Sequence, residues 1–510
     1  MTEIEPQVKV EKRQTRKPLV FKDFYPINPP FGYSGIEILD EKGKMDYVTL
    51  EPNLKEEESL VLDEIRDLII SSQDIQLYVL DNPEEMRDYL KDKIQVVFRK
   101  NEKKINRDCE DKLMYYLFRD FMGYGKMDLL MKDPFIEDIS CNGQESPIYI
   151  WHTIHESMPT NVIYGSSEEL SKTITRLVYK TGQQISVAKP ILEGTLPEGY
   201  RAHVTLDEVS KKGDTFTIRK YRSNPFTMVD LIKKGTVDSK IGAYLWSLVE
   251  FKRSLMICGA VASGKTALLN SVGMFIRPEM KVVSIEEVRE LRLHENWIPM
   301  IARPSFQPGV QEISLFDLLR SALRQRPDYI IVGEVRGEET YTLFQSMAVG
   351  HGGLCSIHAD NLEAVLKRLR TKPMNIPEMM LPLMNSLVLQ RRVKIGEDVE
   401  RRVDEIAELI PPDDVDGKAT LVTRFKWNTS KDSFKYFKPG KTEQDVMHQI
   451  SEVYQIPIEH LRKDLEIKQM ILDYMVKVDV KDYKEVAQMV RNYYLKPQEI
   501  YNLARMENMQ

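Results

Sequence analysis

A glycine-containing stretch near the middle of the chain constrains its fold more than any other feature. A short apolar run at residues 255–258 leads into GAVASGKT, residues 259–266, which fits the pattern G-x-x-x-x-G-K-S/T at every specified position. The glycines allow successive backbone N–H groups to point inward, and the N-terminus of a following helix adds partial positive charge. Because the amphipathic run ALLNSVGMF follows at once, a phosphate-binding loop is a better interpretation than a chance glycine turn.

The positions of this loop have expected roles in binding a nucleotide. Lys265 is expected to reach the β and γ phosphate oxygens, and the Thr266 hydroxyl to take one position on Mg²⁺. The predicted nucleotide-binding residues are Gly259, Ala260, Val261, Ala262, Ser263, Gly264, Lys265, Thr266 and Ala267. The loop therefore predicts ATP or GTP as a ligand and leaves hydrolysis open.

Length and local texture predict several domains. A chain of 510 residues is too long for one ordinary hydrophobic core. Pro225 marks a hinge, because the residue before a proline is biased to extended backbone. The predicted segments are a flexible N-terminal segment (1–50), a helical bundle (51–124), an α/β domain (125–222), a hinge linker (223–226), a phosphate-loop domain (227–440) and a helical C-terminal region (441–510).

Apolar strand-like runs alternate with helical patterns in the phosphate-loop domain. The runs are LMIC, KVVSIE, DYIIVGE, LCSIH and SLVLQ. This alternation predicts an α/β fold with a parallel sheet between two helical layers, in which ligands bind at the carboxyl ends of the strands. Glu286, Glu290, Glu334 and His358 fall at or just past such ends.

Composition limits the compartment and the partners. The net charge of −6 argues against nucleic acid as a partner of the whole surface. The four cysteines are scattered singly, which is typical of a reduced intracellular protein. No window approaches a membrane span, so we expect a cytoplasmic protein that is at most peripherally attached to a membrane. Basic residues among the first seventeen are either a solvated tail or a contact for an anionic lipid surface.

Two acidic stretches are candidates for catalysis. The apolar strand before Glu334 has the context of a Walker B motif, so Glu334 is expected to hold Mg²⁺ or to polarise the attacking water. The stretch SIEEVRE offers Glu286, Glu287 and Glu290, which could position a water and accept its proton. The alternative for this stretch is a solvated acidic turn.

Histidines and arginines near the expected site have more than one interpretation. His351, Cys355 and His358 suggest a metal site, but strand periodicity places Cys355 and His358 on opposite faces. The histidines are otherwise core residues, or His358 contacts phosphate and senses the γ-phosphate. Arg201 and Arg219, on strands before the hinge, are expected to face the β and γ charge of the nucleotide or else to be solvated.

The order of these motifs resembles that of a known superfamily. The phosphate loop, SIEEVRE, the strand ending in VGEVRG and the stretch GHGG…SIHA resemble the Walker A, Asp box, Walker B and His box of type II/IV secretion ATPases. PFIEDISCNG and PILEGTLPEGYRAHVTL extend the resemblance to residues 133–393. The chain is most similar to the archaeal branch, first to archaellum motor ATPases and then to pilus-assembly ATPases.

The resemblance implies a fold and a set of site residues. It implies a RecA-like ATPase core, preceded by a PAS-like α/β domain, in a homohexameric ring that binds nucleotide between the two domains. It makes Glu290 the favoured base, has Glu334 complete the Mg²⁺ site with Thr266, and assigns Arg201 and Arg219 to the N-terminal-domain arginines. The Asp box usually reads Glu-Asp where this chain has Glu286 and Glu287, so the exact base stays open.

The resemblance also implies a function. ATP hydrolysis would drive assembly or rotation of an archaellum-like filament through a polytopic membrane platform protein and other cytoplasmic motor components. An archaeal pilus-assembly or type II secretion ATPase is the nearest alternative. A nucleotide-gated scaffold with little turnover and a nucleic-acid translocase are alternatives of other classes, and the absence of a basic and aromatic stripe in the sequence disfavours the second.

Overall fold

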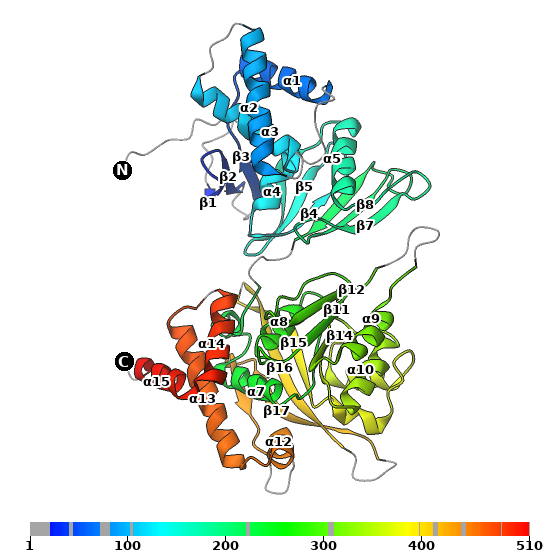
Figure 1. The fold of residues 1–510 in the computed structure, drawn as a ribbon, viewed down its shortest axis with the longest axis vertical. Coiled ribbons are helices and arrows are strands. Elements are labelled where there is room, and N and C mark those ends of the chain that lie inside the picture. The colour runs from blue at the N-terminus through cyan, green and yellow to red at the C-terminus, as the bar shows by residue number, and fades with distance from the viewer. Residues whose placement is uncertain are drawn as a thin grey trace. The chain divides into compact units, whose positions relative to one another are not determined.

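The chain divides into two units, Met1–Arg222 and Ser223–Gln510, and each contains one nine-stranded sheet (Figure 1). The computed structural model describes residues 21–508 except 40–43, 72–81, 102–105, 221–224, 304–310, 397, 412–416, 440–444 and 481. The predicted hinge residues Ser223 and Asn224 therefore lie outside the described residues.

The sheet of the first unit has the order β1-β2-β3-β6-β5-β4-β9-β8-β7. Its strands are β1 (Phe21–Asn28), β2 (Gly32–Ile38), β3 (Met45–Leu50), β4 (Ile136–Cys141), β5 (Pro147–His152), β6 (Glu156–Ile163), β7 (Ile191–Thr195), β8 (Arg201–Thr205) and β9 (Thr215–Arg219). Helix α5 (Ser167–Lys180) covers one face, because Leu170, Ile174 and Leu177 recur at helical spacing and enter the core of the sheet.

The prediction that residues 1–50 form a flexible segment is wrong for the described residues 21–39 and 44–50. These residues form β1, β2 and β3, and β3 pairs with β6 in parallel through Tyr47 and Thr160. The Tyr47 hydroxyl also donates to the buried carboxylate of Asp133 at 2.5 Å. Neighbouring strands among the three pair as hairpins, whereas the contacts of Tyr47 with Thr160 and Asp133 join them to residues more than 80 positions away in the sequence. Residues 1–20 lie outside the described residues.

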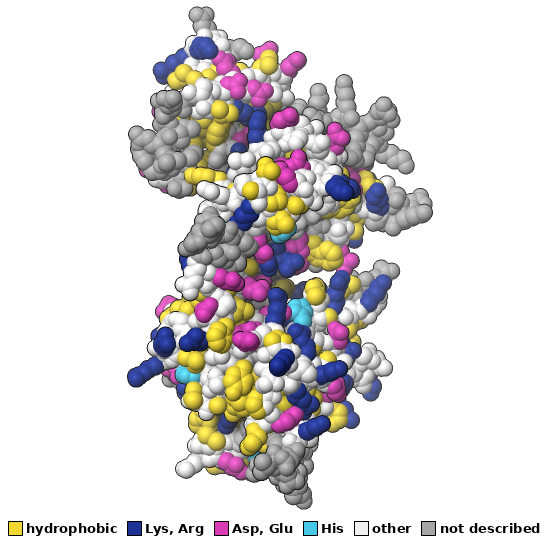
Figure 2. All heavy atoms as spheres, turned by 90° about the vertical axis from the view of Figure 1, so that its right-hand side faces the viewer, with side chains coloured by type: hydrophobic (Ala, Val, Ile, Leu, Met, Phe, Trp, Pro, Cys, Tyr) yellow, Lys and Arg dark blue, Asp and Glu magenta, His cyan; other side chains and the backbone are white. Residues whose placement is uncertain are grey.

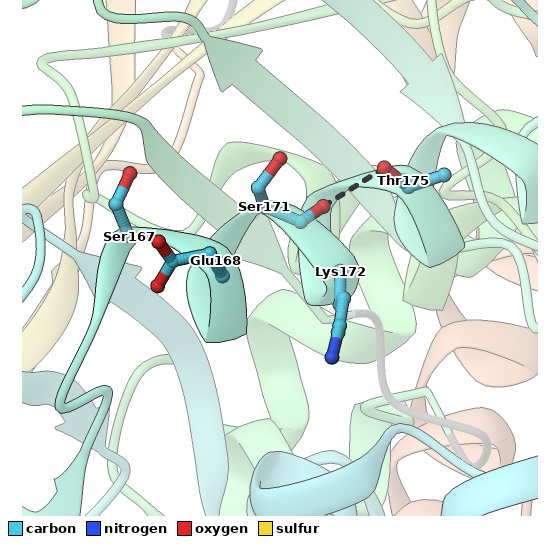
Figure 3. A pocket seen from close by; sticks show the side chains of 5 residues that line it. All are labelled: Ser167, Glu168, Ser171, Lys172 and Thr175. Carbon is cyan, nitrogen blue, oxygen red and sulfur yellow. Dashed lines mark hydrogen bonds between the residues drawn. The ribbon is translucent and has the colours of Figure 1, made fainter. Parts of the chain in front are cut away.

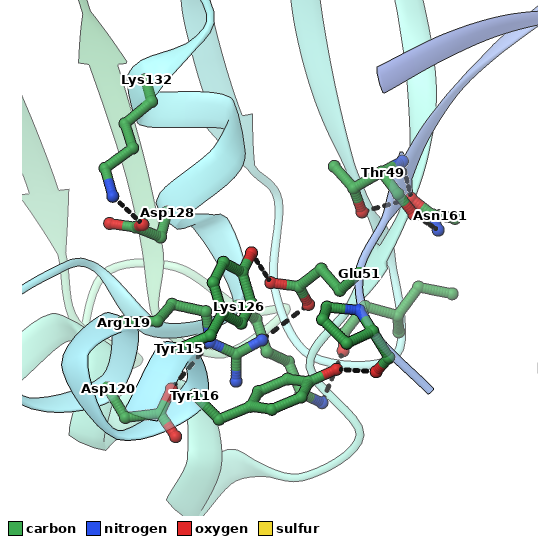
Figure 4. Close-up of polar contacts among 12 residues, drawn as sticks. Thr49, Glu51, Tyr115, Tyr116, Arg119, Asp120, Lys126, Asp128, Lys132 and Asn161 are labelled. Carbon is green, nitrogen blue, oxygen red and sulfur yellow. Dashed lines mark hydrogen bonds and ion pairs between the residues drawn. The ribbon is translucent and has the colours of Figure 1, made fainter. Parts of the chain in front are cut away.

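A bundle of three helices lies beside this sheet. It consists of α1 (Glu56–Ser71), α2 (Pro83–Lys100) and α3 (Arg107–Phe121), which bury a common apolar core. Figure 4 shows how α3 is tied to the end of β3: Arg119 donates to Glu51 at 2.6 Å, and Tyr115 donates to the same carboxylate at 2.9 Å. The short helix α4 (Asp128–Lys132) connects the bundle to β4.

The sheet of the second unit has the order β12-β11-β13-β14-β10-β15-β16-β17-β18. Strands from β12 to β15 are parallel, and β15 to β18 are antiparallel. The strands are β10 (Leu255–Gly259), β11 (Val282–Glu286), β12 (Trp297–Ile301), β13 (Tyr329–Val332), β14 (Gly352–His358), β15 (Ser386–Ile395), β16 (Asp398–Ile410), β17 (Thr420–Asn428) and β18 (Ser433–Tyr436). The predicted α/β class is confirmed, whereas the PAS-like description of the first unit stays a prediction.

Helices cover both faces of this second sheet (Figure 1). The core on one face includes residues of α6 (Met228–Lys233), α7 (Ser239–Glu250) and α8 (Lys265–Gly273). The core on the other face includes residues of α9 (Leu315–Ala322), α10 (Glu339–Ala348) and α11 (Leu362–Arg370). Along a buried strand, alternate side chains therefore enter different cores.

The C-terminal helices share the first of these two cores. They are α12 (Val446–Tyr454), α13 (Ile458–Lys477), α14 (Tyr483–Leu495) and α15 (Pro497–Asn508). The indole of Trp246 on α7 donates to the Tyr494 hydroxyl at 2.7 Å. Lys468 on α13 is fully buried and forms ion pairs with Asp464 at 2.6 Å and with Glu250. The predicted helical C-terminal region thus packs directly on the phosphate-loop unit.

No helix among the described residues is long and apolar enough to cross a membrane. On the face drawn in Figure 2, the described basic and acidic side chains are interspersed. The four cysteines are unpaired: Cys141, Cys258 and Cys355 are buried, and Cys109 on α3 is partly exposed.

Candidate functional site

The phosphate loop joins the end of β10 to the start of α8. A Cβ atom at Gly259 would lie 2.4 Å from the main-chain oxygen of Gln390 and 2.5 Å from Ser263 Oγ, so only glycine fits there. Gly264 has φ +92°, a backbone conformation that glycine adopts without strain. Helix α8 begins at Lys265 with no side-chain cap, so its first N–H groups are available to an anion.

Lys265 is held across the loop that precedes it. Its ammonium group donates to the main-chain oxygens of Gly259 at 3.1 Å and Ala260 at 3.0 Å. Burial is the main cause that lowers the pKa of Lys265, while the negative charge of Glu334 opposes the change. These two hydrogen bonds hold the ammonium group on the inner side of the phosphate loop, where it is predicted to contact phosphate.

His358 connects the loop lysine to the acid of the Walker B strand. It lies at the end of β14, which pairs with β10 so that His358 is opposite Gly259. Its Nδ1 is 3.3 Å from Lys265 Nζ, and its Nε2 is 3.3 Å from Glu334 Oε2. Burial and the nearby charge of Lys265 lower the pKa of His358. In the neutral ring, Nδ1 accepts from the ammonium group and Nε2 donates to the carboxylate.

Arg336 holds the Glu334 carboxylate from the other side. Its Nε and one terminal nitrogen lie 2.7 and 3.0 Å from the two Glu334 oxygens, a bidentate pair. The other terminal nitrogen is 3.3 Å from Glu287. Partial burial raises the pKa of Glu334, but the hydrogen bonds and charge of Arg336 outweigh it and lower that pKa overall. Glu334 is therefore ionised at neutral pH.

Glu286 differs from the other acids of the Asp box. It is 3% exposed, and its Oε1 accepts from the main-chain N–H groups of Glu290 at 2.9 Å and Leu291 at 3.1 Å. Burial raises the pKa of Glu286 to about 7, although these two hydrogen bonds act in the opposite direction. Glu286 thus fixes the backbone at Glu290, while Glu287 is exposed and Glu290 is half-buried.

Two oxygen donors near the loop suit Mg²⁺. In nucleotide sites this ion keeps several waters and binds one or two protein side chains together with phosphate oxygens. The Thr266 hydroxyl and the ionised Glu334 carboxylate are such donors. No group of three or more His, Cys, Asp or Glu side chains arranged to hold a metal occurs among the described residues. The donor set fits the predicted Mg²⁺ with nucleotide, and it does not suit a protein-only metal cage.

Arg201 and Arg219 are neighbours in the first unit. They lie opposite each other on β8 and β9. Each is paired with an acid: Arg219 Nε is 3.1 Å from Asp138, and Arg201 contacts Glu193. The structure thus brings the two predicted arginines together on one sheet face, and their predicted nucleotide contact stays a prediction.

The metal interpretation of the His box finds no support in the position of its side chains. Cys355 is buried in one core of the sheet, and His358 points from the other face of β14 toward Lys265. His351 Nδ1 lies 2.6 Å from the main-chain oxygen of Pro327, at the opposite end of the strand. Of the two histidines, only His358 belongs to the site.

Sequence reasoning missed three residues that touch the site. Arg336 was part of the VGEVRG run, and its position two residues after an acid was the available signal. Gln390 and Arg401 reach the loop from β15 and β16, and no motif singles them out.

The first unit has a shallow hollow on its surface. Figure 3 shows that it is lined by one face of α5, by Ser167, Glu168, Ser171, Lys172 and Thr175. The Thr175 hydroxyl donates to the main-chain oxygen of Ser171 at 2.8 Å, a bond within the helix.

Comparisons with solved structures give distant likenesses. The VirB11 ATPase of the Brucella suis type IV secretion system is 23% identical, with a TM-score of 0.28 over 56% of this chain and 92% of that one. The ATPase DotB of Legionella pneumophila is 16% identical, with a TM-score of 0.40 over 77% of this chain and 96% of that one.

Comparisons of sequence give closer relatives. An uncharacterized protein of Methanocaldococcus jannaschii is 35% identical over 405 residues, which are 78% of this chain and 72% of the relative. The type IV secretion system protein PtlH of Bordetella pertussis is 29% identical over 44% of this chain and 76% of that protein. The family model described as "Type II/IV secretion system protein" matches residues 129–470, a span that contains β4 to β9, the phosphate loop and all the acids of the site. The chain therefore belongs to the type II/IV secretion system protein family.

Proposed function

We propose that the chain is an Mg²⁺-dependent ATPase. The observation that carries this proposal is the continuous set of contacts from Lys265 through His358 to Glu334, which links the phosphate loop to an ionised acid. A scaffold that only bound nucleotide would need the loop and the lysine, but it would not need an acid and a histidine beside the γ-phosphate position.

The proposed roles follow from these positions. The loop and Lys265 bind the phosphates of ATP, and Thr266 and Glu334 hold Mg²⁺, which offsets phosphate charge. Glu290 is the proposed base, with its backbone fixed by the Glu286 carboxylate. Arg201 and Arg219 of the same chain or of a neighbouring copy add positive charge at the phosphates.

At the cellular level, we propose a homohexameric motor at the cytoplasmic face of the membrane. It would act on a polytopic membrane platform protein, with other cytoplasmic motor components, to assemble or rotate an archaellum-like filament. Membership in the type II/IV secretion family supports this proposal, and the similarity to an archaeal protein favours the archaeal branch.

Steady-state hydrolysis of MgATP against protein concentration tests the ATPase. We expect specific activity to rise with concentration as rings form. Glu334→Ala and Glu290→Ala should each lower kcat by about 10²–10⁴-fold, because a positioned acid or base contributes about that factor. Both variants should still bind MgADP, since neither removes a residue of the loop.

The matched control is Glu363→Ala, which removes an exposed acid from α11 in the same unit. It should keep the activity of the natural chain. Tight nucleotide binding with negligible turnover at every concentration would contradict the free-standing motor and favour the scaffold.

A deletion strain separates the possible filaments. The archaellum assignment expects loss of swimming with adhesive pili and secretion retained. Loss of pili with normal swimming would assign the chain to pilus assembly instead.

A further inference from the structure

We propose that Arg401, on β16, binds the diphosphate part of the nucleotide that ATP and ADP share. This inference rests on the proposed nucleotide binding, and it adds a second wall to the site. The known motifs of the site lie on β10, β11, β13 and β14, whereas Arg401 belongs to the antiparallel hairpin on the other side of the loop.

The sheet order places the phosphate loop between two different walls. Strand β10 lies between β14 and β15. His358 approaches the loop from the β14 side and brings Glu334 with it. On the β15 side, a Cβ atom at Gly264 would lie 3.1 Å from Gln390 Nε2 and 3.7 Å from Arg401 Cγ. Arg401 therefore lies against the last glycine of the loop, where α8 begins.

The charge environment of Arg401 differs from that of the other arginines on this hairpin. Arg391 pairs with Asp404 at 3.0 Å, and Arg402 pairs with Asp432 at 2.8 Å. The Arg401 guanidinium makes a weak contact, 3.5 Å to the main-chain oxygen of Val399. Among the described residues, no carboxylate is paired with Arg401.

Arg401 also faces another cation. It lies directly opposite Arg392 in the register of β15 and β16. Arginine suits a phosphate contact because its planar donors match phosphate oxygens.

Gln390 provides an independent sign that this wall is built for polar contact. It is 1% exposed, and its Oε1 is buried without a hydrogen-bond partner among the described residues. A buried acceptor without a partner is costly in an ordinary core. Here the amide lies against Gly264, beside the N–H groups that open α8, so the wall next to the loop is polar where the phosphates would lie.

The position of Arg401 beside the phosphate loop favours contact with the shared diphosphate over contact with the γ-phosphate. The acids and His358 lie on the β14 side, which is where the γ-phosphate and the attacking water belong. A group on the opposite wall, next to the first turn of α8, reaches the α and β phosphates. Removing the Arg401 side chain should therefore weaken the binding of ATP and the binding of ADP by the same factor.

Binding constants of the full chain test this proposal. The variants are Arg401→Ala, Arg401→Lys and the control Arg391→Ala, which removes an arginine from the opposite face of the same hairpin. The ligands are MgATP, MgADP and inorganic pyrophosphate, measured with the natural chain in parallel. We expect Arg401→Ala to weaken the binding of all three ligands by about tenfold or more, in line with the loss of a charge-assisted hydrogen bond. Arg401→Lys should recover part of that loss, and Arg391→Ala should bind as the natural chain does.

The other outcomes are distinguishable. Unchanged binding in Arg401→Ala overturns the inference, and so does an equal loss in Arg391→Ala, which would indicate a general effect on the hairpin. Weaker MgADP with unchanged pyrophosphate also overturns it, because Arg401 would then contact the base or the ribose. If the natural chain binds none of the ligands, the proposed function itself fails, and that result is independent of either variant.

Discussion

At the scale of one residue, burial and hydrogen bonding have opposite effects on the ionisation of Glu286. Its carboxyl group has almost no exposure, yet it accepts two backbone N–H groups that favour the charged form. Burial dominates and raises the pKa from 4.5 to about 7. The native state therefore binds a proton more tightly than the unfolded state does, and the cost of ionising Glu286 grows as the pH rises.

The pH dependence of unfolding tests this assignment. Because the folded-state pKa is raised, the free energy of unfolding should fall as the pH rises from about 4.5 to about 7, by roughly 3 kcal/mol from this group. Glu286→Gln keeps an acceptor oxygen and cannot ionise. It should match the natural chain near pH 4.5 and be the more stable of the two at pH 8, as measured by urea unfolding without nucleotide.

The control for this experiment is Glu363→Gln, an exposed acid in the same unit, which should follow the pH curve of the natural chain. A natural chain whose stability does not change relative to Glu286→Gln between pH 5 and pH 8 would contradict a raised pKa.

The sequence predicted the site residues that lie in the phosphate loop or at the carboxyl ends of strands. The phosphate loop and the acids at strand ends could be placed, because parallel strands bring their carboxyl ends to one edge. Their separate roles could not: Glu286, Glu287 and Glu290 look alike in sequence, and only burial and hydrogen bonding distinguish them. Arg401 could not be predicted, because it reaches the loop through strand order.

At the scale of elements, the buried ammonium group of Lys468 joins α13 to α7. Lys468 donates to Ser247 Oγ at 3.1 Å and pairs with Asp464 and Glu250, and Glu250 also pairs with Arg277 at 2.7 Å. The cluster joins a C-terminal helix to the helix that precedes β10. Removing one partner of a buried ion pair leaves an uncompensated charge, which is strongly destabilising.

We therefore expect Lys468→Met to lower the free energy of unfolding by about 3 kcal/mol or more. Chemical unfolding of the full chain measures this, with Lys484→Met, at an exposed lysine of α14, as the control. Adding Glu250→Gln to Lys468→Met should restore part of the loss, because it removes one of the charges left behind. Equal stability of Lys468→Met and Lys484→Met would contradict a structural role for the cluster.

Elements with strong helical periodicity were predicted well, and strands with distant partners were not. Helices α1, α2 and α3 lie within residues 51–124, for which a helical bundle was predicted. Strands β1 to β3 were missed although neighbours among them pair as hairpins, and distant contacts such as Tyr25 donating to Asp133 at 2.9 Å are not visible in the sequence.

At the scale of the whole molecule, the N-terminal strands are part of the first unit. Ile36 and Tyr47 are fully buried in its core, and each large buried side chain contributes about 1.5–3 kcal/mol. We expect a chain that lacks residues 1–50 to lose several kcal/mol of stability in this unit, seen as a lower-temperature calorimetric transition and faster proteolysis. A chain that lacks residues 1–20 keeps every described strand and should resemble the full chain. Identical behaviour of the two truncations would contradict the role of these strands.

The distribution of thiols has a practical consequence for following this protein in solution. Burial raises the pKa of Cys258 to about 12, and it also raises the pKa of Cys141 and Cys355. Thiolate, the reactive form, is therefore scarce at these three side chains, which are also shielded from reagents. Burial and the nearby charge of Glu58 also raise the pKa of Cys109, but Cys109 is the partly exposed member of the set, so it is the thiol that a maleimide dye reaches. This thiol lies on α3 of the helical bundle, and a single-label optical reporter needs no engineered cysteine.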